Sequence, residues 1–89
     1  MPYQPNRTAA QIVQRLVRDG FTVKVPDEPH RSIYTLVLDR GLHFGTLHIS
    51  AAKGRALRIS ITWQLTNKTR KAEGARAIIG LLNNLPKEG

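Results

Sequence analysis

The sequence predicts one small α+β domain in which an antiparallel meander of three or four strands lies between an N-terminal and a C-terminal helix. Apolar residues recur at helical spacing near both ends of the chain, and between these ends the spacing changes to an alternation of period two interrupted by turn signals. A chain of 89 residues can bury one modest core. We therefore expect a single domain over residues 1–89, with an ordered core at about 8–85 and loose ends at 1–7 and 86–89.

The first helix is predicted from the segment TAAQIVQRLVRDG. Thr8 followed three residues later by Gln11 fits a capping box. Gly20 suits the left-handed position after a helix, from which Phe21 can fold back onto Leu16 as in a Schellman motif. The apolar face of this helix consists of Ala9, Ile12, Val13, Leu16 and Val17.

The middle of the chain predicts strands joined by short turns. FTVKV alternates apolar and polar residues and is a first strand if its backbone is regular, and three longer runs then follow: SIYTLVL, LHFGTLHISA and ALRISITWQL. In the last run, one set of residues is apolar and the intervening set is polar, which predicts one apolar and one polar sheet face. The apolar set is Leu57, Ile59, Ile61, Trp63 and Leu65, so Trp63 is interpreted as a core residue.

The C-terminal helix is predicted from an apolar stripe that Pro86 ends. The stripe consists of Ala72, Ala75, Ile78, Ile79, Leu82 and Leu85. The helix is expected to begin near Lys68, capped by Thr66 or Asn67, and Gly74 suggests a close backbone approach. Both helices should pack side by side on the apolar sheet face, in a two-layer domain of order α-β-β-β-β-α, or α-β-β-β-α if FTVKV is irregular.

Charge indicates the class of partner. The chain has 14 Lys and Arg against 6 Asp and Glu, a net charge of +8, and residues 46–89 hold 8 of the cations and only 2 of the acids. This asymmetry favours a polyanion, most often nucleic acid. The chain has no cysteine, which excludes disulfides and thiolate zinc sites, and no run of apolar residues suits a membrane span or a signal peptide. We expect a cytoplasmic protein with no membrane partner.

The order of elements over residues 8–85 resembles the double-stranded-RNA-binding domain, with a helix, an antiparallel sheet and a second helix. That family contacts RNA through its first helix, the loop between its first two strands and a lysine-rich start of its last helix. The resemblance implies contacts from the matching positions, which are Gln11, Gln14, Arg15 and Arg18, then Arg40, Gly41 and His43 of the turn DRGLH, and finally Lys68, Arg70 and Lys71.

A second resemblance concerns VRDGFTVKV followed by PHRSIY, which is similar to the opening of HicA-type toxins, small messenger-RNA interferases in which a histidine serves catalysis. The corresponding residue here is His30, which follows Glu28 and Pro29. It has no convergent catalytic partner in the sequence, so we interpret it as a surface turn residue.

Catalytic and metal-binding groups are not apparent in the sequence. His43 and His48 differ by five positions in one predicted strand and therefore face opposite ways, and there is no pair of carboxylates and no glycine-rich phosphate loop. We predict neither enzymatic activity nor a metal or other cofactor.

The predicted function is binding to the phosphate backbone of RNA or DNA with little sequence discrimination. Backbone N–H groups at 67–71 would hold a phosphate at the helix start. The side chains expected to contact nucleic acid are Arg15, Arg18, Arg40, His43, Arg58, Lys68, Arg70, Lys71 and Arg76. The alternative is a protein-interaction module, including a homodimer, that docks through its polar sheet face or through a strand edge offered by LHFGTLHIS or SIYTLVLDR.

Overall fold

The computed structural model describes residues 3–85 and confirms the α+β fold, with five strands in one antiparallel sheet. Helix α1 spans Arg7–Arg18, and helix α2 spans Ala75–Asn84. The strands follow one another across the sheet in sequence order: β1 (Thr22–Lys24), β2 (Ile33–Arg40), β3 (His43–Ser50), β4 (Ala56–Trp63) and β5 (Lys68–Glu73). FTVKV does form a strand, but a short one.

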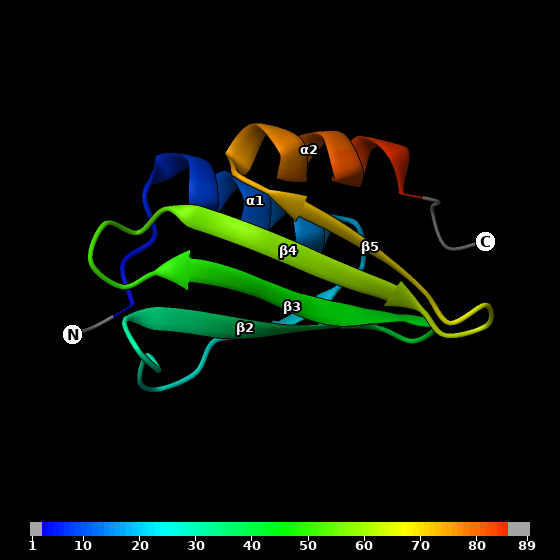
Figure 1. Ribbon diagram of the computed structural model, residues 1–89, viewed down its shortest axis with the longest axis horizontal. Helices are drawn as coiled ribbons and strands as arrows, with labels where there is room; N and C mark the ends of the chain where they lie inside the picture. Colours follow the sequence, from blue (N-terminus) through cyan, green and yellow to red (C-terminus); the bar gives the residue numbers. More distant parts are fainter. Residues whose placement is uncertain (1–2, 86–89) are drawn as a thin grey trace.

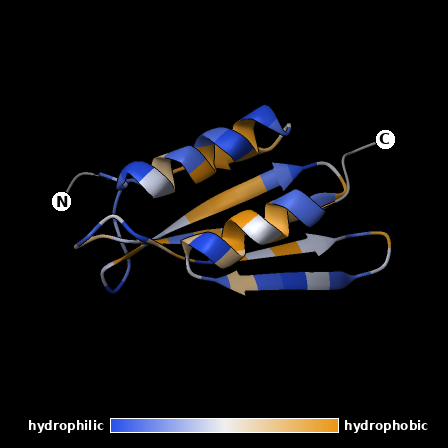
Figure 2. Cartoon of the chain, turned by 90° about the horizontal axis from the view of Figure 1, so that it is seen from above, coloured by the Kyte–Doolittle hydropathy of each residue, from blue (hydrophilic) through white to orange (hydrophobic). Residues whose placement is uncertain are grey.

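The two helices lie side by side on one face of the sheet, as predicted, and leave the other face open (Figures 1 and 2). The core lies between these two layers. Its buried side chains are Ala9, Ile12, Leu16, Phe21, Tyr34, Leu36, Leu38, Leu47, Ile49, Ala56, Ile59, Ile61, Ile78 and Leu82. Neither helix of the described chain is long and apolar enough to cross a membrane.

Helix α1 begins one residue before the expected cap. The side chain of Asn6 accepts a hydrogen bond of 2.8 Å from the backbone N–H of Ala9, so the predicted capping box between Thr8 and Gln11 is wrong. The predicted C-terminal motif is confirmed. The N–H of Phe21 donates to the carbonyl of Leu16 at 2.9 Å, and Gly20 has a φ of 99°.

Residues 3–6, the described part of the segment before α1, contact the rest of the domain, whereas a loose end was expected at 1–7. The ring of Tyr3 meets that of Tyr34 edge to face at 5.4 Å between centroids. The N–H of Asn6 donates to the carbonyl of Gly54 at 2.8 Å. The ordered chain therefore begins before residue 8, whereas the predicted stop at Pro86 and the loose end at 86–89 lie outside the described residues.

Strand β5 is the main correction to the sequence prediction, because the segment expected to start the last helix is an edge strand. Asn67, at a φ of 59°, donates its N–H to the carbonyl of Trp63 and turns the chain back beside β4. Residues 68–73 then pair with β4, and α2 begins only after Gly74. Figure 2 shows β5 as a mostly hydrophilic strand outside α2. Its sequence, KTRKAE, lacks the apolar alternation that would have indicated a strand.

A register shift changes the faces of β4 at its start. His48 pairs with Arg58, but Ile49 pairs with Ala56, so Leu57 is displaced from the predicted apolar series and Ala56 is buried in its place. Ile59 and Ile61 are buried as predicted. At the other end of the series Trp63 is 37% exposed and Leu65 is 67% exposed, so neither is the core residue that was expected.

The edges of the sheet differ from those proposed for partner docking. LHFGTLHIS forms β3, which is enclosed between β2 and β4 and has no free edge. SIYTLVLDR forms β2, and β1 covers only its residues Val37–Asp39. The full-length edge in the described chain is β5, which pairs with β4 alone.

A glycine permits a close approach between β3 and β4, but it is Gly45 in β3 and not Gly74. A Cβ atom on Gly45 would lie against the carbonyl of Ser60 and 2.9 Å from the Cα of Ile61. Around Gly74 nothing lies within 4 Å of the corresponding position, so the close approach predicted there is wrong. Gly74 instead provides a φ of 86° between β5 and α2.

We expect Gly45→Ala to lower the free energy of unfolding by about 1–3 kcal/mol, because the added methyl group must push β3 and β4 apart. Gly80→Ala is the control, since nothing lies within 4 Å of a Cβ added at that helical glycine. It should raise stability by up to about 1 kcal/mol. Urea unfolding curves measure both changes, and equal effects of the two substitutions would contradict the close contact.

Candidate nucleic-acid interface

The nine predicted contact residues do not form one site. Arg40 and His43 are buried, and Arg15 and Arg18 line a groove between the helices. The remaining residues lie around β4, β5 and the first turn of α2: Arg58, Lys68, Arg70, Lys71 and Arg76. Exposure and position, and not residue type alone, therefore decide which of these side chains can contact a large ligand.

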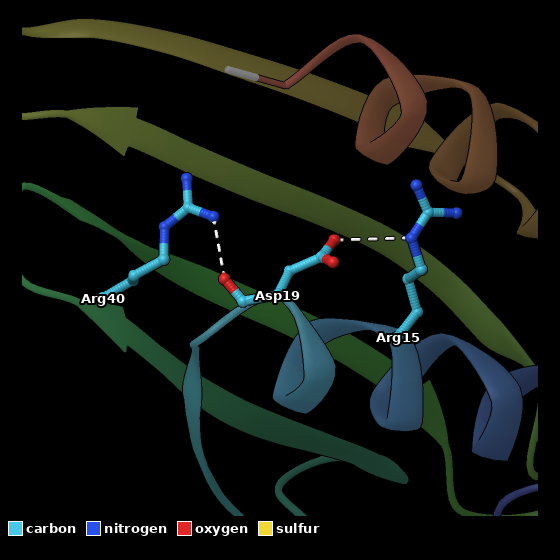
Figure 3. A network of polar contacts seen from close by, with 3 residues as sticks. All are labelled: Arg15, Asp19 and Arg40. Carbon is cyan, nitrogen blue, oxygen red and sulfur yellow. Dashed lines mark hydrogen bonds and ion pairs between the residues drawn. The ribbon is translucent and has the colours of Figure 1, made fainter. Parts of the chain in front are cut away.

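Arg40 holds the end of α1 against the sheet and is only 7% exposed, so it does not lie at the surface, where the predicted contact with nucleic acid would place it. Its Nη1 donates to the backbone carbonyl of Asp19 at 3.0 Å, and its guanidinium lies 4.5 Å from the centroid of the Phe21 ring. The Asp19 carboxylate also pairs with the Nε of Arg15 at 3.3 Å (Figure 3). Arg40 therefore supplies a donor to one of the carbonyls that the end of a helix leaves without an intrahelical partner.

His43 is also buried, at 5% exposed, and its contacts are with other residues of the domain. This corrects its predicted role as a surface contact. Its Nδ1 accepts a hydrogen bond of 3.3 Å from Nη2 of Arg40. Its ring stacks on Trp63, with 5.8 Å between centroids and an interplanar angle of 11°. His43 and His48 lie on opposite sheet faces, as predicted, because the register places His43 with Trp63 and His48 with Arg58.

The exposed cations of β5 alternate between the two sides of the sheet edge. The register puts Lys68 and Arg70 on the helix side, opposite Trp63 and Ile61, and Lys71 on the open side. None of the three forms an ion pair with another residue of 3–85, and Arg70 donates to the carbonyl of Asn84 at 3.4 Å. The predicted phosphate site at a helix start is wrong, because residues 67–71 form a turn and an edge strand.

Two of these cations border an open pocket of about 180 Å³ at the end of the sheet, on the helix side. Sequence reasoning missed Trp63 here, because the parity of β4 places it on the apolar face. No local pattern signalled its exposure, because the strand was expected to run to Leu65 and the last helix to begin near Lys68, whereas β4 ends at Trp63 and α2 begins at Ala75. The pocket is lined by His43, Ile61, Trp63, Thr66, Lys68, Arg70 and Leu85.

The groove between the helices has a volume of about 410 Å³ and is the place where the first helix would offer its predicted contacts. Arg18 is exposed there, but Arg15 is partly buried and paired with Asp19. Ile79 and Leu82 form the α2 side of the groove, so its walls are mixed apolar and polar.

On the open sheet face, Arg58 donates its Nε to the Nδ1 of His48 at 2.7 Å. Partial burial and, to a smaller extent, the charge of Arg58 lower the pKa of His48. Lys71 lies one strand away, opposite Ser60, and all of these groups line a hollow of about 230 Å³. No set of three metal-ligating side chains within residues 3–85 is placed to hold an ion, and His30 is an exposed turn residue, as predicted.

Arg40→Gln should lower the free energy of unfolding by about 1.5–3 kcal/mol, because it removes a charged hydrogen-bond donor from the partly buried carbonyl of Asp19. Arg18→Gln makes the same chemical change at an exposed position of α1 and should have an effect within about 0.5 kcal/mol. Chemical denaturation measures both. A similar small effect in the two variants would mean that Arg40 does not hold α1 to the sheet.

The pKa of His48 should lie below its ordinary value of about 6.5, and Arg58→Gln should raise it. Because the folded-state pKa is lowered, the unfolded chain binds more protons in this range. The contribution of His48 to stability is therefore present above about pH 6.5 and is lost as the pH falls through the folded-state pKa. An NMR titration of the His48 ring measures the pKa. Arg55→Gln, which removes a charge from the β3–β4 turn, is the control and should leave it unchanged.

Comparisons with protein-family models, with curated proteins and with solved structures found no match to this chain. The resemblances to the double-stranded-RNA-binding domain and to HicA-type toxins therefore stay predictions that rest on element order and short motifs.

Proposed function

We propose that the protein is a non-enzymatic nucleic-acid-binding domain that grips the phosphate backbone along the edge strand β5. The observation that carries the proposal is the presence of three exposed cations within four residues of one strand, Lys68, Arg70 and Lys71, with no ion-pair partner among residues 3–85. Unpaired cations on a rigid element favour an anionic polymer with closely spaced charges.

The geometry of β5 suits contacts to a backbone better than contacts to bases of a duplex. Side chains in a strand alternate, at about 3.3 Å per residue, so Lys68 and Arg70 lie about 6.6 Å apart on one side while Lys71 projects to the other. The edge strand β5 can then lie along the phosphates of a nucleic-acid backbone. Lysine and arginine contacts to phosphate carry no sequence information directly, which supports the predicted lack of discrimination.

Arg58 and Arg76 extend this surface in two directions. Arg58 lies on the open face opposite Glu73, and Arg76 lies in the first turn of α2, close in sequence to the end of β5. Arg40 and His43 are left out of the proposed interface because they are buried, and Arg15 because Asp19 neutralises it.

Charged residues on an edge strand have a second effect, which is to discourage pairing with another sheet. This favours a nucleic-acid ligand over a second copy of the chain at β5, because two such edges would bring the cations of both copies together. A protein partner that adds a strand to β5 would have to be acidic. Binding of this kind, with no affinity for nucleic acid, is the outcome that would contradict the proposal.

The direct test is a titration of the protein with duplex RNA, duplex DNA and single strands at two salt concentrations. Affinity should fall with salt, with a log–log slope of about 0.9 per phosphate neutralised on B-DNA and about 0.7 on a single strand. An absence of binding to every one of these ligands at about 50 mM salt would overturn the proposal.

Replacing Lys68, Arg70 and Lys71 together by glutamine should weaken binding sharply and reduce the salt slope by up to about 0.9 for each phosphate of B-DNA that is no longer neutralised. The matched control replaces Arg7, Lys53 and Arg55, which are all exposed. Arg7 begins α1, and Lys53 and Arg55 lie in the β3–β4 turn, at the end of the sheet opposite the β4–β5 turn (Figure 1). Both variants lack the same number of positive charges, so a difference between them reports position and not net charge. If both lower affinity equally, β5 is not the interface.

A further inference from the structure

Trp63 is the one tryptophan of the chain, and it is held in place at the uncovered end of the sheet. It is the last residue of β4 and lies on the helix side of the sheet, where it remains 37% exposed. The stacked ring of His43 supports the indole, and Arg40 in turn holds His43 through the 3.3 Å hydrogen bond to Nδ1. Since His43 and Arg40 are both buried, the aromatic surface is fixed before any ligand arrives.

The pocket beside Trp63 combines an apolar floor with a cationic rim. Ile61, Trp63 and Leu85 contribute the apolar surface. Lys68 and Arg70 stand directly opposite Trp63 and Ile61 in the neighbouring strand. At about 180 Å³ the pocket is smaller than the roughly 300–1,000 Å³ of sites that enclose a drug-sized ligand, so it suits one planar group of a larger molecule.

We propose that this pocket receives an unpaired base of a single-stranded nucleic acid, which stacks against Trp63 while its neighbouring phosphates contact Lys68 and Arg70. The flat apolar group matches the indole, and the negative charge that must accompany it matches the rim. A paired base in a duplex is stacked between its neighbours and cannot enter, so the pocket gives a preference for single strands. The inference rests on the proposed function and specifies its ligand.

Two single-stranded oligonucleotides that carry the same charge test whether a base occupies the pocket. One is an oligothymidylate of about 12 nucleotides, and the other is an abasic strand with the same number of phosphates. The thymidylate should quench the fluorescence of Trp63 and bind about tenfold more tightly than the abasic strand, because stacking contributes per base and phosphate contacts are equal. These measurements on the wild-type protein need no variant to fold.

Two substitutions then separate the pocket from the rest of the surface. Trp63→Leu should remove the preference for thymidylate over the abasic strand, while Trp63→Phe keeps part of it. Phe44→Leu is the control, since Phe44 is 43% exposed but lies on the open face, in register with Thr62. That variant should retain the full preference and the full quenching of Trp63.

The outcomes distinguish this inference from the proposed function. Equal binding of both strands with unchanged Trp63 fluorescence would overturn the base pocket and leave backbone binding intact. Loss of the preference in Phe44→Leu as well as in Trp63→Leu would also overturn it. No binding of either strand or of a duplex would overturn both. A blue shift of Trp63 with anionic lipid vesicles, without nucleic-acid binding, would instead assign this exposed apolar end to a membrane surface.

Discussion

The structure depends on the burial of one face of a five-stranded sheet beneath two short helices. Helices of 12 and 10 residues cover the middle of that face, where the aliphatic side chains of β2, β3 and β4 meet Leu16 and Ile78. They end before the sheet does, and the β4–β5 turn extends past α2 (Figure 1). The apolar face is therefore continuous with an uncovered end, and the residues there, Trp63 above all, combine a fixed position with access to solvent.

A buried cation connects this uncovered end with the first helix. Arg40 contacts the carbonyl of Asp19 on one side and His43 on the other, and His43 stacks on Trp63. Burying a charge is costly unless hydrogen bonds and a polarisable neighbour offset the loss of water, and here the carbonyl, the imidazole and the ring of Phe21 do so. Arg40 thus organises the interior, whereas Lys68, Arg70 and Lys71 are exposed and form no ion pair within residues 3–85.

The cationic side chains of the edge strand β5 both protect the sheet edge and border the two hollows beside it. An exposed edge of a sheet invites pairing with other chains, and cationic side chains reduce that tendency. The same side chains stand next to the pocket at Trp63 on one side and next to Arg58 and His48 on the other. Since Asn67 and Gly74 both adopt positive φ, the turns at the two ends of β5 set where these charges lie.

Local patterns in the sequence were enough to predict the two-layer α+β order, the Schellman end of α1, the central strands and the excess of positive charge. These features follow from hydrophobic periods, from turn residues and from composition. Hydrophobic periods and turn residues act within a few neighbouring residues. Packing across the whole chain settled the rest. KTRKAE became a strand because β4 offered it backbone hydrogen bonds, although its own residues carry no strand period. Arg40 and His43 became buried and Trp63 exposed because strand parity gives the face of the sheet, while the lengths of the covering helices determine which part of that face water can reach.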